Sequence, residues 1–146
     1  MGLDNGFYVR SNYRHLSRRM LPSGIIYPFD DVWEEHMEIS YHRKDWGWRN
    51  SIMNTFNWKD TNMMTDEEYD ALPDHHCVLE TPEQVMKLIE LTVSWMDEEK
   101  WEAEGDSIWD YQTARKHLLS DLVNFTLIYG FMQTNPDIYL EFYDSY

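Results

Sequence analysis

The chain of 146 residues carries a formal net charge of −15, and 16% of its residues are aromatic. This length suits one domain with a sizeable core, and the aromatic content, which includes seven Trp and ten Tyr, argues against a disordered chain. The single cysteine, Cys77, excludes an intramolecular disulfide framework. We therefore expect residues 1–146 to form a single globular domain.

The negative charge is concentrated in the second half of the sequence. Residues 1–60 contain eight Lys or Arg and eight Asp or Glu, whereas residues 61–146 contain four and nineteen. Because contact with a phosphate backbone requires cations, this distribution argues against direct binding to nucleic acid and favours a basic protein partner or simply solubility. No apolar run reaches the ~18 residues of a membrane span, and the first residues do not resemble a signal peptide. The expected location is the cytoplasm, without membrane contact.

The longest helical pattern covers residues 111–131 and predicts a central helix. Its apolar side chains recur at spacings of three and four residues, at Ala114, Leu118, Leu122, Phe125 and Tyr129. The stripe is widened by four further apolar residues, Leu119, Val123, Leu127 and Ile128. We therefore expect burial on more than one side of this helix. Asp110 is placed to cap its N-terminus, and Pro136 blocks any continuation.

Two more helices and several short strands are expected. One helix starts near Lys44, and the other starts where Thr81 and Gln84 can form a capping box. Alternating apolar residues or strand-forming composition predict strands over 6–10, 37–41, 77–79 and 138–143. The fold class is therefore α+β: three main helices packed on a small sheet of short, mostly antiparallel strands, with the two terminal strands sharing that sheet.

Two segments carry a family resemblance. The chain opens with Met1-Gly2-Leu3-Asp4 before an aromatic strand, and Tyr41-His42-Arg43-Lys44 leads into a helix that runs on to Phe56 and Trp58. These features resemble an uncharacterised family of small phage and prophage proteins, which carry a Tyr-x-Arg-Lys segment before a short helix ending in aromatic residues. The sequence departs from that pattern at His42, where Trp is commoner. The resemblance implies a phage or mobile-element origin and a place in the host cytoplasm, and it implies no activity.

An acidic segment with aromatic residues is the first candidate site. Residues 97–110 combine many acidic residues with two tryptophans. The candidate partner-binding residues are Asp97, Glu98, Glu99, Trp101, Glu102, Glu104, Asp106 and Trp109. Tryptophan contributes strongly when it inserts into a partner pocket, and carboxylates steer basic surfaces. The alternative is a solvated loop whose tryptophans pack on the core.

A cationic surface and a metal cluster are two other candidates. A nucleotide or phosphate ligand could stack and pair on Tyr41, Arg43, Lys44, Trp46 and Arg49, unless these cations simply pair with the abundant acids. A metal could be held by some of Asp74, His75, His76 and Cys77, because carboxylate, imidazole and thiolate are all zinc ligands. The alternative for that tetrapeptide is an ordinary strand entrance with a buried Cys77.

Two functions follow from these candidates. The first is an acidic, phage-encoded interaction protein that binds and inhibits a basic host or defence protein, with its second half imitating the charge of nucleic acid. The second is a small-molecule, nucleotide or metal-dependent protein. The sequence contains no Gly-rich phosphate loop, nucleophile elbow, HExxH or CxxC motif. We therefore assign no catalytic residue and no cofactor, and the interaction protein is the preferred interpretation.

Overall fold

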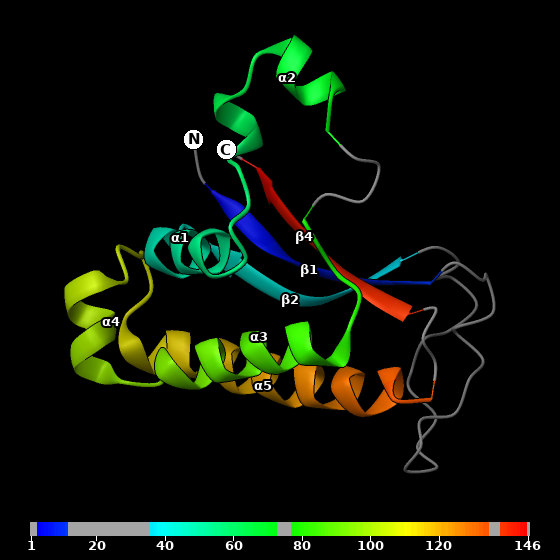
Figure 1. Cartoon of the computed structure of the whole chain (residues 1–146). Coiled ribbons are helices and arrows are strands. Elements are labelled where there is room, and N and C mark those ends of the chain that lie inside the picture. Colours follow the sequence, from blue (N-terminus) through cyan, green and yellow to red (C-terminus); the bar gives the residue numbers. More distant parts are fainter. Residues whose placement is uncertain (1–2, 12–35, 73–76, 135–137, 146) are drawn as a thin grey trace.

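The computed structural model describes residues 3–11, 36–72, 77–134 and 138–145, and the structure that follows is that of these residues. They form a mixed α/β fold with a four-stranded antiparallel sheet (Figure 1). In chain order the elements are β1 (Asp4–Ser11), β2 (His36–Arg43), α1 (Trp46–Thr55), the 3-10 helix η2 (Thr61–Met63), α2 (Asp66–Asp70), β3 (Val78–Leu79), α3 (Pro82–Ser94), α4 (Glu98–Glu104), α5 (Tyr111–Met132) and β4 (Ile138–Ser145).

The sheet has the strand order β2-β1-β4-β3, so β1 lies between the second strand and the last. Its residue Phe7 is paired with Ser40 of β2 and with Phe142 of β4. This pairing confirms that the strands near the two ends of the chain share a sheet. The β1–β2 register shifts between Phe7 and Tyr8, which leaves Ile39 as the additional residue of a β-bulge in β2.

Helices α1, α3 and α5 lie below the same face of the sheet (Figure 1). The inward side chains of β1 meet α5 directly, since the ring of Phe7 contacts that of Phe125 edge-on with centroids 5.4 Å apart. Helix α3 begins at the expected capping box of Thr81 and Gln84. The core is therefore one layer between a sheet face and the helices. No helix among the described residues is long and apolar enough to cross a membrane.

Helix α5 confirms the expected central helix, with Asp110 as its N-cap and the Asp110 carboxylate accepting from the backbone N–H of Thr113. Its buried residues follow a narrow stripe: Ala114, Leu118, Asp121, Phe125, Ile128, Phe131 and Met132. Leu119 and Val123 are 37% and 59% exposed, so the expectation of burial on several sides is wrong for them. The charged residue Asp121 instead occupies the centre of the buried stripe.

The described residues form five α-helices, of which α4 lies in the acidic segment after Met96. This acidic segment contributes to the core, since Trp101 of α4 is only 3% exposed. Its ring meets that of Trp95 edge-on at 5.7 Å, and its Nε1–H donates to the carbonyl of Trp109. A single large apolar side chain therefore anchors an otherwise acidic helix.

The N-terminus of α1 is hydrogen-bonded to the C-terminal end of α4. The backbone N–H groups of Trp46 and Gly47 donate to the carbonyls of Asp106 and Gly105, at 3.2 and 2.8 Å. The unpaired donors at the start of one helix thus meet carbonyls at the end of another. A Cβ on Gly47 would lie 2.1 Å from the carbonyl oxygen of Glu104, so only glycine allows this approach.

We predict that Gly47→Ala lowers the free energy of unfolding by on the order of 2 kcal/mol, because the methyl group would force the α1–α4 contact apart. Gly130→Ala is the matched control, since a Cβ there meets nothing within 4 Å inside α5. That change should raise stability by about 0.5–1 kcal/mol through helix propensity. Urea unfolding of both variants measures the difference, and equal effects would contradict the close α1–α4 contact.

Candidate functional site

A buried ionic cluster lies at the junction of the sheet and the helices. His42 of β2 is fully buried, and both of its ring nitrogens face carboxylates. Nδ1 is 2.6 Å from Oδ2 of Asp45, and Nε2 is 2.5 Å from Oδ2 of Asp121 in α5. The Asp45 carboxylate also accepts from the Ser107 hydroxyl. We call His42, Asp45 and Asp121 the His42 cluster.

A tight turn after β2 brings Asp45 back to His42. Lys44 adopts a left-handed conformation, with φ of 53°, and its N–H donates to the carbonyl of Leu3 at 2.6 Å. Such a conformation is uncommon for a residue with a side chain. Asp45 then takes the N-cap position of α1, but its side chain does not cap the helix. That carboxylate is directed to His42 and Ser107 instead.

His42 carries a positive charge at neutral pH. Burial lowers its pKa, but the charge and hydrogen bond of Asp121, followed by those of Asp45, outweigh burial and raise the pKa to about 9. The imidazolium therefore donates from both nitrogens, and one positive charge is shared by two carboxylates. With both nitrogens engaged, His42 is a structural cation and is not placed to transfer a proton to a ligand.

Aromatic rings enclose the cluster. The Trp48 ring stacks on His42 with centroids 4.8 Å apart and an angle of 19° between the planes, a geometry that favours the cationic form. On the other side, His117 stacks on Trp109 at 3.9 Å. Burial, and then the positive charge of His42, lower the pKa of His117, so this second imidazole is neutral at pH 7.

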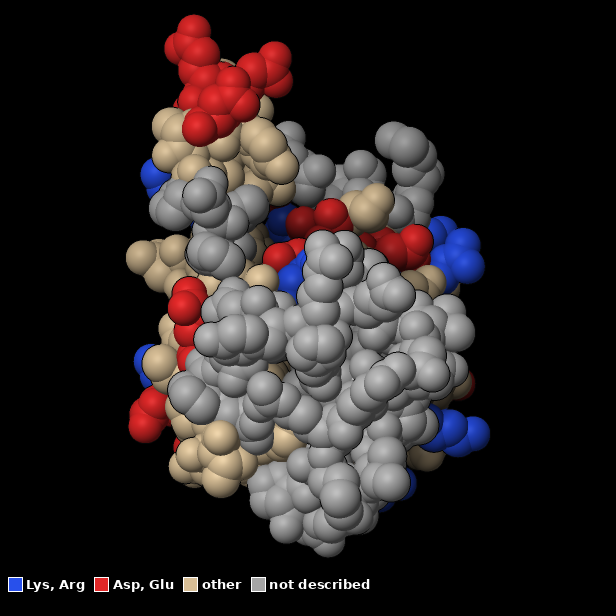
Figure 2. Space-filling model, turned by 90° about the vertical axis from the view of Figure 1, so that its right-hand side faces the viewer, with Lys and Arg blue, Asp and Glu red and all other residues tan. Residues whose placement is uncertain are grey.

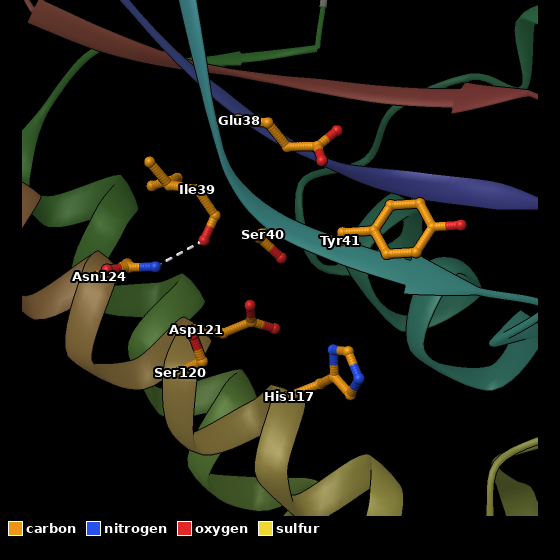
Figure 3. A pocket seen from close by; sticks show the side chains of 8 residues that line it. All are labelled: Glu38, Ile39, Ser40, Tyr41, His117, Ser120, Asp121 and Asn124. Atoms are coloured by element: carbon orange, nitrogen blue, oxygen red, sulfur yellow. Dashed lines mark hydrogen bonds between the residues drawn. The ribbon is translucent and has the colours of Figure 1, made fainter. Parts of the chain in front are cut away.

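An open pocket of about 270 Å³ lies beside the cluster, between the edge strand β2 and helix α5. Eight residues line it: Glu38, Ile39, Ser40, Tyr41, His117, Ser120, Asp121 and Asn124 (Figure 3). The α5 side chains also bond the strand edge, since the Asn124 amide donates to the carbonyl of Ile39 at 2.7 Å and His117 hydrogen-bonds the Tyr41 backbone. We call this cavity the β2–α5 pocket.

Arg49 does not belong to the cationic ligand surface that the sequence suggested. Its side chain is 7% exposed, and the guanidinium pairs with Asp60 at 3.0 Å and with Asp144 at 2.7 Å. Asn5 is opposite both His42 and Asp144 in the sheet register, so it lies between the two buried ionic groups. The expectation of a ligand contact at Arg49 is wrong, because distant carboxylates of the chain already occupy its donors.

The other members of that predicted surface are more accessible. Tyr41 and Arg43 are exposed, whereas Lys44 and Trp46 are half-buried. The Tyr41 hydroxyl donates to the Asp4 carboxylate at 2.9 Å. Of these residues, Tyr41 also lines the β2–α5 pocket.

Only one member of the predicted metal cluster lies within the described residues. Asp74, His75 and His76 fall outside them, while Cys77 is half-buried. Burial is the main cause that raises the pKa of the Cys77 thiol to about 11. Because the thiolate is the form that binds metal, this environment disfavours coordination. Within the part of the chain that the structure describes, no three metal-binding side chains come together.

The acidic candidate residues divide into two kinds. The carboxylates are exposed as expected: Asp97, Glu98, Glu99, Glu102, Glu104 and Asp106. Trp101 and Trp109 do not form exposed anchors, because Trp101 is buried in the core and Trp109 is half-buried against His117 and His42. The prediction of aromatic anchors on this surface is therefore wrong, while its charge is present.

Sequence reasoning missed His42 and Asp121 as a pair because 79 positions separate them. One local signal was available for Asp121. It lies three residues after Leu118 and four before Phe125, so it falls on the buried stripe of α5. A charged residue at such a position requires a partner inside the core.

Comparison with models of protein families, with curated proteins and with solved structures gives no match to this chain.

We predict that the free energy of unfolding falls by roughly 3 kcal/mol as the pH rises from 6.5 to 9. The folded pKa of His42 is raised, so its contribution is fully present below the unfolded value of about 6.5 and is lost as pH approaches about 9. Urea unfolding across this range measures the effect.

His42→Gln is the control for that experiment. It cannot be charged, so it should be less stable at pH 6.5 and should lose most of the pH dependence. Ionisation of Cys77 in the unfolded chain lowers stability near the top of the range in both proteins and cancels in the difference. The same slope in both proteins would contradict a buried imidazolium.

Proposed function

We propose that this protein binds a basic partner protein through the carboxylates of α4 and its flanking turns. The observation that carries the proposal is the group of exposed carboxylates on this helix, which is held to the core. Asp97, Glu98, Glu99, Glu102 and Glu104 are all exposed, while Trp101 holds the helix to the core. Long-range attraction by such a surface raises the rate of association with a basic partner and makes the binding more specific.

The cations among the described residues do little to compensate the charge of α4. Lys100 lies 4.4 Å above the ring of Trp95 and donates to the Ser94 hydroxyl, so its ammonium is held toward α3. Between described residues, the ion pairs involve Arg10, His42 and Arg49, and none of them reaches α4. Among the described residues, no ion pair neutralises the carboxylates of α4, and this surface is therefore electronegative.

A second acidic group lies on α2, well away from α4 (Figure 1). Its exposed residues are Asp66, Glu67, Glu68 and Asp70, and in Figure 2 red carboxylates cover the tip that projects at the top of the molecule. The excess charge thus forms at least two separate groups. We propose α4 as the docking surface because it packs on the core through Trp101, whereas α2 has no buried residue.

The proposed partner is a host or defence protein that binds nucleic acid, inhibited because α4 occupies the basic surface meant for phosphates. The resemblance to small phage proteins supports this choice of partner, and the host cytoplasm is the proposed place of action. The acidic composition supports it as well, since a basic groove that tracks nucleic acid attracts carboxylates for the same electrostatic reason.

We predict that a variant in which four glutamates of α4 are replaced by glutamine binds the partner much more weakly. The changes are Glu98→Gln, Glu99→Gln, Glu102→Gln and Glu104→Gln, and Asp97 is kept because it caps α4 by accepting from the N–H of Lys100. Partners retained from a bacterial lysate at low salt are identified, and their affinity is then measured. We expect at least a ~10-fold loss for the variant and a fall in wild-type affinity as salt rises.

The matched control removes the same charge from α2: Asp66→Asn, Glu67→Gln, Glu68→Gln and Asp70→Asn. This variant should keep the partner, and duplex DNA should compete with the wild-type protein for it. Binding that is insensitive to salt, or equal losses for the two variants, would count against a docking surface on α4.

A further inference from the structure

We propose that the side of α3 and α5 that is turned away from the sheet is a contact surface for a second copy of this chain. These two helices form the bottom layer of the molecule in Figure 1, and no other labelled element lies beneath them. We call this surface the α3–α5 face. It is separate from the carboxylates of α4, and the inference does not depend on the function proposed for them.

Exposed apolar side chains occupy the middle of the α3–α5 face. Leu119 and Val123 are one helical turn apart on α5, and Val123 lies opposite the buried stripe of this helix. Val93 of α3 is 52% exposed and lies two turns after Met86, which lines a pocket together with Tyr129 of α5. Val93 is therefore on the side of α3 next to α5. A second copy would give Leu119 and Val123 the burial that their apolar pattern predicts.

Opposite charges lie toward the two ends of this face. Arg115 precedes Tyr129 by two intervals of seven residues, so both are on the side of α5 next to α3. Beside Tyr129, near the other end of α5, the two acids Glu83 and Glu90 outnumber the single cation Lys87. Arg115 and Glu83 are exposed, and neither forms an ion pair with another described residue. Each end of the face is therefore complementary in charge to the opposite end.

A two-fold axis brings both pairs of complementary ends together. When the α5 helices of two copies cross antiparallel at Val123, each residue lies opposite the residue at the same distance on the other side of position 123. Arg115 of one copy is then opposite position 131 of the other, within one turn of Tyr129 and close to Glu83. Because the symmetry forms this contact twice, a second copy suits the face better than an unrelated partner.

The size of the α3–α5 face indicates a weak dimer. Helices α3 and α5 have 13 and 22 residues, so they are roughly 20 and 33 Å long. Two such helices side by side present about 500 Å² per copy, or about 1,000 Å² in the dimer, which is near the lower limit for a specific interface. Each copy also carries a net charge of −15, and this repulsion opposes association until salt screens it.

Sedimentation equilibrium at about 0.3 M NaCl, where long-range repulsion is screened, tests this interface. We expect the wild-type protein to dimerise with a Kd on the order of 50 μM. Val123→Lys should be monomeric, because it places two ammonium groups together at the two-fold axis. Ile108→Lys is the matched control, since Ile108 is 57% exposed but lies outside α3 and α5, and it should leave the dimer unchanged. A wild-type protein that is monomeric at about 1 mM, or equal effects of the two variants, would overturn the proposal.

Charge reversal tests the antiparallel arrangement of the two copies. Arg115→Glu and Glu83→Lys should each weaken the dimer by roughly 10-fold, because each replaces attraction by repulsion at two symmetry-related contacts. The double variant restores opposite charges at both contacts and should recover most of the wild-type affinity. A double variant that dimerises no more tightly than either single variant would rule out this contact and, with it, the proposed dimer.

The variant with four glutamines on α4 separates this inference from the proposed function. Those glutamates lie outside the α3–α5 face, so the variant should dimerise at least as tightly as the wild-type protein although it binds the basic partner weakly. Loss of the dimer in this variant would mean that α4 holds the two copies together, and the α3–α5 face would be rejected as the interface.

Discussion

The buried imidazolium of His42 is the constraint on which the arrangement of β2, α1 and α5 depends. It holds the carboxylate that opens α1 and the carboxylate at the middle of the α5 stripe, at 2.6 and 2.5 Å. An ion pair in the core is a weak source of net stability, but loss of one member leaves an uncompensated charge. The strand, the turn and the helix must therefore be in place together. The same contact fixes β2 beside α5, where Asn124 and His117 hydrogen-bond to the backbone of this strand.

Elements defined by local patterns could be predicted from the sequence. The Asp110 cap and the spacing of apolar residues define α5, the Thr81–Gln84 box defines the start of α3, and alternation defines β4. Helix α4 was missed because one tryptophan among acids gives no periodic stripe, and its anchoring contacts come from α3 and the turn before α5.

The candidate site was less predictable than the fold, because its members come from distant parts of the chain. In the sequence, Arg49 resembles a ligand-binding residue. Only the tertiary structure shows that it forms buried ion pairs with Asp60 and Asp144. Ser40 and Glu38 are ordinary strand residues until the bulge at Ile39 and the proximity of α5 create a pocket around them. Exposed charge on α4 followed from composition alone, whereas the burial of Trp101 required the tertiary structure. The molecule thus combines the buried His42 cluster with two separate acidic groups, on α2 and α4.

The most direct test of this account is the protonation state of His42, measured by NMR of the 15N-labelled imidazole at pH 7.5. The account predicts that both ring nitrogens carry protons at that pH and that the ring loses one only near pH 9. A neutral ring at pH 7.5, with one nitrogen bare and a midpoint near the ordinary value of about 6.5, would contradict it.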